Sequence, residues 1–231
     1  MLPPSEPLST SILAIMYAGD VVFAISGALC AARHRMDALG FVLIGTITGI
    51  GGGTTRDLLL GRTVWWTQDP AELVLCMVAA LATYFFIKHD ISQRKGMIWS
   101  DALGLACFGV VGCHVALGFG APFIVAVFLG MVTATGGGVI RDTMTQTQPM
   151  ILCGELYATA ALAGSLTYAV LIQLSLPEGV AEGLAFLIAF SLRAATILFN
   201  IRMGPPGEFI RIGGRNVEQN PQETVTPQTL K

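Results

Sequence analysis

A glycine-rich motif occurs twice in the chain, as TITGIGGGTTRD at residues 46–57 and as TATGGGVIRD at residues 133–142. Both copies place three consecutive glycines inside a long apolar run. Each glycine costs about 1 kcal/mol relative to alanine in a helix interior. We therefore expect the glycines to break a helix in both places and to leave backbone groups exposed.

A constant offset of 85 residues relates the two copies, pairing Thr48 with Thr133 and Asp57 with Asp142. Asp20 and Asp101 correspond more loosely, since each lies near the start of the apolar run that precedes a glycine-rich run. The sequence therefore predicts two homologous units with three membrane spans in each. Because three is odd, the second unit would enter the membrane from the opposite side, which gives an inverted repeat.

The composition identifies the solvent around these runs. Hydrophobic residues make up 53% of the chain and charged residues 12%, and the mean hydropathy is +0.68. Soluble domains carry about twice that share of charge, so we expect a membrane protein. The net charge of −2, with no basic stripe, argues against a nucleic-acid partner.

Seven apolar runs predict an all-α membrane protein, built as an inverted 3+3 repeat plus one helix, with the second and fifth helices broken at the glycine triplets. The positive-inside rule places the N-terminus outside and the C-terminus in the cytoplasm. The expected segments are an external N-terminal segment (1–9), the first repeat (10–88), a cytoplasmic connector (89–98), the second repeat (99–174), the seventh helix (180–201) and a polar cytoplasmic tail (202–231).

The expected breaks predict a polar path through the protein. Irregular backbone at membrane depth is tolerated only beside water or inside protein. Freed carbonyls and threonine hydroxyls would suit a cation, whereas the free N–H groups that follow would suit an anion, and a small zwitterion could use both. The alternative is that the glycines serve only close helix packing. The candidate path residues are Thr46, Thr48, Gly51, Gly52, Gly53, Thr133, Thr135, Gly136, Gly137 and Gly138.

Each motif ends in an Arg-Asp dipeptide, Arg56-Asp57 and Arg141-Asp142. Side chains at i and i+1 on a helix point apart, so we expect partners elsewhere in the chain. We predict the pairs Asp20–Arg56 and Asp101–Arg141, one at each mouth of the path, acting as gates or as structural staples. Glu155 and Arg193 are a further candidate pair within apolar runs.

Enzymatic chemistry has no support in these residues. The five cysteines show no CxxC spacing, and Ser100-Asp101 with a lone His114 does not form a nucleophile-and-base set. We expect no catalytic residues, no cofactor and no bound metal apart from ions in transit.

The paired GGGTTRD and GGGVIRD motifs, their spacing and the three-plus-three-plus-one layout resemble the prokaryotic branch of the trimeric intracellular cation (TRIC) channel family, over about residues 17–201. The resemblance implies a homotrimer in the inner membrane, with a pore in each protomer that passes K⁺ and, to a lesser degree, Na⁺. Its expected partners are these ions, membrane lipid and other copies of the chain. Such bacterial sequences are also grouped as glycine transporters, so a secondary transporter for a small zwitterion such as glycine is the alternative.

Overall fold

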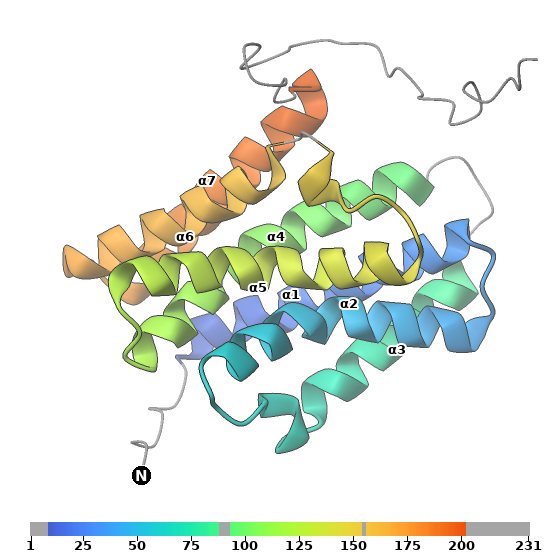
Figure 1. Ribbon diagram of the computed structural model, residues 1–231, viewed down its shortest axis with the longest axis horizontal. Coiled ribbons are helices and arrows are strands. Elements are labelled where there is room, and N and C mark those ends of the chain that lie inside the picture. Colours follow the sequence, from blue (N-terminus) through green and yellow to red (C-terminus); the bar gives the residue numbers. More distant parts are fainter. Residues whose placement is uncertain (1–8, 88–92, 154–155, 202–231) are drawn as a thin grey trace, which may run out of the picture.

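The computed structural model describes residues 9–87, 93–153 and 156–201, and every regular element in these ranges is helical (Figure 1). The prediction of a seven-helix, all-α protein is confirmed. The elements are α1 (Thr10–Arg33), α2 (Ala38–Leu59), η1 (Trp65–Thr67), α3 (Ala71–Phe86), α4 (Gln93–Gly118), α5 (Phe123–Met144), η2 (Met150–Leu152), α6 (Tyr157–Gln173) and α7 (Glu178–Phe199). The tail at 202–231, most of the N-terminal segment and connector residues 89–92 lie outside the described ranges.

Five of the helices are long and apolar enough to cross a membrane, namely α1, α2, α4, α5 and α7. The other two, α3 and α6, are apolar but shorter, with 16 and 17 residues. The fourth helix begins at Gln93, before the expected start at Trp99, so part of the expected connector is helical. The sixth helix begins only at Tyr157, because η2 occupies the start of the sixth apolar run.

The inverted repeat is visible in the helix boundaries. Moving α2 and η1 forward by 85 residues reproduces the boundaries of α5 and η2. In Figure 1, α2 and α5 lie side by side in the middle of the molecule and run in opposite directions. The third helix of each repeat follows its 3₁₀ turn, and α7 packs against α6 and α4 outside the repeat.

The predicted breaks in the second and fifth helices are wrong. The α2 helix continues through Gly51–Gly53 to Leu59, and α5 continues through Gly136–Gly138 to Met144. The carbonyls before the glycines therefore keep their helical hydrogen bonds. A run of glycines lowers helix propensity, but tertiary packing routinely overrides propensity.

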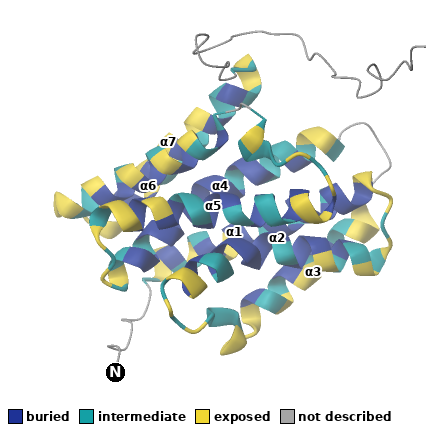
Figure 2. Cartoon of the chain, in the orientation of Figure 1, coloured by how far each residue is buried: buried dark blue, intermediate teal, exposed yellow. Residues whose placement is uncertain are grey.

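The fourth helix has the largest buried share of the spanning helices and packs against α1, α5, α6 and α7. Figure 2 shows buried faces turned inward and exposed residues on the outer faces of α3 and α7. The exposed residues of these outer faces include Val78, Phe85, Leu187 and Leu198. Large apolar side chains on an outer surface are expected where lipid is the solvent.

Candidate functional site

The glycine triplets form the contact between α2 and α5. A Cβ added to Gly52 would lie 2.0 Å from the carbonyl oxygen of Thr133, and one added to Gly137 would lie 2.1 Å from the carbonyl oxygen of Thr48. Gly136 meets the Cα of Gly52 at 3.1 Å, measured in the same way. Only hydrogen fits at Gly52 and Gly137, so these glycines bring two backbones together.

This contact obeys the internal two-fold relation. The 85-residue offset converts Gly52 into Gly137 and Thr133 into Thr48, so the two closest approaches are copies of each other. The pseudo-symmetry axis therefore passes through the crossing of α2 and α5, which we call the glycine crossing. Close packing, the alternative reading of the triplets, accounts for their position in continuous helices.

Thr48 and Thr133 bring their backbone carbonyls to the glycine crossing, while their hydroxyls lie against Gly27 on α1 and Gly112 on α4 and donate within their own helices. Thr48 Oγ1 donates to the Ile44 carbonyl at 2.6 Å, and Thr133 Oγ1 donates to the Leu129 carbonyl at 2.6 Å. Thr135 repeats this pattern with the Met131 carbonyl at 2.9 Å. Each hydroxyl proton is used, so these side chains can offer only oxygen lone pairs to another group. Thr46 differs, because its buried hydroxyl has no partner among the described residues.

The Arg-Asp dipeptides do pair internally, contrary to the prediction. Arg56 Nη2 lies 2.8 Å from Asp57 Oδ1, and Arg141 Nε lies 2.8 Å from Asp142 Oδ1. The side chains leave the helix in different directions, but the long arginine chain bends back to its neighbour. The other oxygen of each aspartate accepts a backbone N–H at the start of the following 3₁₀ turn, from Trp65 at 3.4 Å or Met150 at 3.1 Å.

The predicted Asp101–Arg141 pair is confirmed. Arg141 Nη1 donates to Asp101 Oδ1 at 2.8 Å and also to Ser26 Oγ at 2.8 Å. Both Arg141 and Asp101 are fully buried. Ser26, Asp101, Arg141 and Asp142 form what we call the second-repeat cluster. This cluster connects α1, α4 and α5 at the C-terminal end of α5.

The predicted Asp20–Arg56 pair is wrong. The ion pairs of Arg56 and Asp57 in the described chain join these two residues to each other and Asp57 to Arg62 at 3.6 Å. The 85-residue offset relates Asp101 to Met16, so Asp20 lies one helical turn further along its helix than the true counterpart. The loose correspondence between Asp20 and Asp101 was the source of the error.

Glu72 and Tyr157, both buried, are cluster residues that the sequence analysis did not select. The 85-residue offset relates their positions on α3 and α6, but the residue is a glutamate in the first repeat and a tyrosine in the second. Glu72 accepts a hydrogen bond from Trp65 Nε1, and the Tyr157 ring lies 5.0 Å from the Arg193 guanidinium. Aligning the repeats at the fixed offset would have drawn attention to both.

The Glu155–Arg193 pair cannot be placed, because Glu155 lies outside the described ranges.

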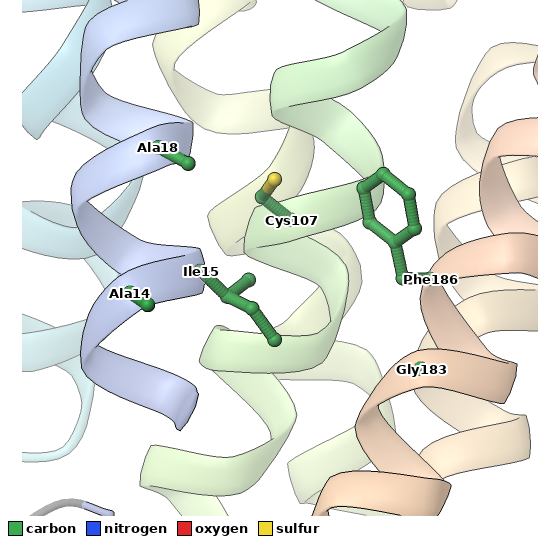
Figure 3. A pocket seen from close by; sticks show the side chains of 6 residues that line it. All are labelled: Ala14, Ile15, Ala18, Cys107, Gly183 and Phe186. Atoms are coloured by element: carbon green, nitrogen blue, oxygen red, sulfur yellow. The ribbon is translucent and has the colours of Figure 1, made fainter. Parts of the chain in front are cut away.

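A separate hollow lies between α1, α4 and α7. It has a volume of about 400 Å³ and is lined by Ala14, Ile15, Ala18, Cys107, Gly183 and Phe186 (Figure 3). Its lining is apolar, so it offers no ligands to an ion. No group of three or more metal-ligating side chains occurs in the described ranges.

Comparison with known proteins places this arrangement in a family. A family model described as "Glycine transporter" matches residues 13–88 and again 98–173, which are the two repeats. The UPF0126 inner membrane protein YadS of Escherichia coli is 37% identical over 188 residues, covering 80% of this chain and 91% of that protein. A UPF0126 membrane protein of Vibrio cholerae is 37% identical over 166 residues, covering 69% of this chain and 68% of that protein.

Solved structures of similar proteins have the same fold as this chain. The TRIC trimeric intracellular cation channel orthologue from Rhodobacter sphaeroides superposes with a TM-score of 0.81 at 41% identity, covering 83% of this chain and all of that one. A prokaryotic TRIC channel crystallised in 0.5 M KCl superposes with a TM-score of 0.75 at 30% identity, covering 82% of this chain and 96% of that one. The chain therefore belongs to the prokaryotic branch of the TRIC channel family, whose sequence model carries the description glycine transporter.

Proposed function

We propose that the chain is a monovalent cation channel that passes K⁺ in preference to Na⁺, with one pore along the glycine crossing of each protomer. The observation that carries the proposal is the chemistry of this crossing. Glycines remove side chains from the contact, and the backbone carbonyl oxygens of Thr48 and Thr133 lie directly at it. Oxygen lone pairs can replace the hydration shell of a cation and repel an anion.

The same contacts imply that the crossing is shut in the state described. The backbones at Gly52 and Thr133 touch, which leaves no room for an ion between them. Permeation therefore requires α2 and α5 to move apart, and the two-fold relation means that one separation opens both halves. The candidate ligands in the open crossing are Thr46, Thr48, Thr133 and Thr135, with Gly51–Gly53 and Gly136–Gly138 supplying backbone oxygens.

The charged clusters support this route through their positions on α2 and α5. Arg56 and Asp57 are in the last turn of α2, and Arg141 and Asp142 are in the last turn of α5. Since the helices run in opposite directions, one cluster would flank each mouth (Figure 1). Their mutual hydrogen bonds fix the helix ends while the crossing opens.

The relatives support the remaining parts of the proposal. Solved relatives are named as trimeric cation channels, and the YadS protein is named as an inner membrane protein. We infer a homotrimer in the inner membrane with an external N-terminus and a cytoplasmic C-terminus, contacting lipid through its outer faces and performing no catalysis.

The alternative function is secondary transport of a small zwitterion such as glycine, which the description of the family model favours. A carrier would bind its solute at the crossing and rock the two repeats about the two-fold axis. Purified protein in planar bilayers separates the two functions. Unitary current steps that reverse at the K⁺ equilibrium potential support the channel, whereas silent bilayers together with saturable uptake of labelled glycine into proteoliposomes support the carrier.

A further inference from the structure

Asp20 is a buried carboxyl group without a hydrogen-bond donor. It lies in the middle of α1 and is fully buried, and neither of its oxygens has a partner in the described part of the chain. Arg56, the expected counter-ion, is bonded to Asp57. An ionised carboxylate in this position would cost several kcal/mol. Asp20 therefore needs either a proton or a bound cation.

A second buried carboxyl, that of Glu72 in the first turn of α3, lies on a helix that packs against α1. One turn further along α3, Cys76 Sγ donates to the Asp20 carbonyl at 3.7 Å, which fixes the contact between α1 and α3. Two carboxyl groups hydrogen bond to each other only when one of them holds a proton. Glu72 already accepts from Trp65 Nε1, so Glu72 is the better anion and Asp20 the proton donor.

The charges around this pair leave one negative charge uncompensated. The first-repeat cluster contains the carboxyls of Asp20, Asp57 and Glu72 against the guanidiniums of Arg56 and Arg62. One proton removes the surplus. The second repeat lacks this feature, because the counterparts of Asp20 and Glu72 at the fixed offset are Leu105 and Tyr157.

We propose that Asp20 and Glu72 form a carboxyl pair that holds a single proton, carried by Asp20 and donated to Glu72. Loss of the proton would create an acidic site for one monovalent cation beside the glycine crossing. The proton site rests on the burial of the two carboxyls and on the lack of a donor for Asp20 in the described part of the chain, while its effect on cations rests on the proposed channel function.

Other titratable or charged groups act on the pair from each neighbouring element. They are Tyr17 on α1, Arg56 on α2, Asp69 before α3, Cys76 on α3 and Cys107 on α4. Arg56 supplies the positive charge in this set, and the other groups are acidic.

Infrared spectroscopy of the purified, reconstituted protein tests the proton directly. Isotope-labelled aspartate shifts only the bands of aspartic acids, which separates Asp20 from Glu182, another buried carboxyl without a hydrogen-bond partner in the described ranges. We expect a protonated aspartic acid band at neutral pH that disappears on alkaline titration. We also expect the band to be absent in Asp20→Asn and retained in Asp101→Asn, since Asp101 accepts its hydrogen bond from Arg141.

The absence of this band from labelled wild-type protein overturns the proposal. This measurement uses the wild-type protein alone, so it does not depend on whether a variant folds. A band that persists in Asp20→Asn also overturns it, because the proton would belong to another residue.

The effect on cations is measured as K⁺ current at neutral and alkaline pH, with each side of the bilayer titrated in turn. Current that rises several-fold in wild type but not in Asp20→Asn supports the cation site, and equal responses reject it. If wild type carries no current at all, the channel function fails while the infrared result stands.

Discussion

Replacing Gly52 with alanine would drive a methyl group into the opposite helix of the glycine crossing. The added Cβ would lie 2.0 Å from the Thr133 carbonyl oxygen, whereas ordinary van der Waals contact begins near 3.4 Å. The obstacle is backbone, which cannot rotate away as a side chain can. The helices would therefore have to separate locally by about 1.4 Å, the difference between these distances.

The expected cost follows from two opposing effects. Overpacking of a well-packed contact costs about 1–3 kcal/mol, and alanine recovers about 1 kcal/mol of helix propensity. We expect Gly52→Ala to lower the free energy of unfolding by up to about 2 kcal/mol, the difference between these two effects. Gly137→Ala should cost the same, because the two-fold relation gives it an equivalent contact at 2.1 Å.

Gly183→Ala is the matched control. Gly183 is also helical, but nothing lies within 4 Å of its added Cβ, so alanine should leave stability unchanged or raise it. Stability would be measured by thermal unfolding of the purified protein in one detergent. The same wedge should favour the open crossing, so Gly52→Ala should raise the fraction of time that unitary currents are open. If Gly52→Ala is as stable as Gly183→Ala, the glycine crossing is not the tight contact described here.

Two further predictions concern the charged clusters and the threonines. Arg141→Gln should destabilise the protein by about 3–5 kcal/mol, because it leaves the buried Asp101 without its counter-ion. Arg56→Gln should cost less, since Asp57 keeps Arg62 and the Trp65 N–H; equal shifts in thermal unfolding would contradict this ranking. Thr48→Val and Thr133→Val should change stability by less than about 1.5 kcal/mol, the usual net worth of one hydrogen bond, yet lower unitary K⁺ conductance. Wild-type conductance in both variants would show that these oxygens do not contact the ion.

Much of the fold could be predicted from local pattern. Long apolar runs fixed the helices, and the repeated motif with its constant offset predicted the inverted repeat. The fixed 85-residue offset also predicts residue correspondences that we had not applied to Asp20 and Glu72. Applied strictly, it relates Asp101 to Met16 and would have excluded the Asp20–Arg56 pair, and it would have aligned Glu72 with Tyr157.

The state of the glycine helices could not be predicted in this way. Three glycines weaken a helix, but they also allow the closest possible approach of a second backbone. Which effect prevails depends on whether another helix lies opposite, and only the tertiary structure supplies the Thr133 and Thr48 carbonyls that occupy the space. The Arg-Asp pairing depended similarly on the bend of a long side chain, which helix periodicity does not describe.

The proposed route for cations is tested most directly by cysteine modification within the glycine crossing. Thr48→Cys or Thr133→Cys would be placed in a background with Cys153 replaced by serine, because the other four native cysteines are buried. Leu166→Cys on the exposed face of α6 is the control. A small, positively charged thiol reagent added during K⁺ recording should block current in both threonine variants and spare the control. Full current after mass spectrometry has verified modification at residue 48 or 133 would contradict permeation through the crossing.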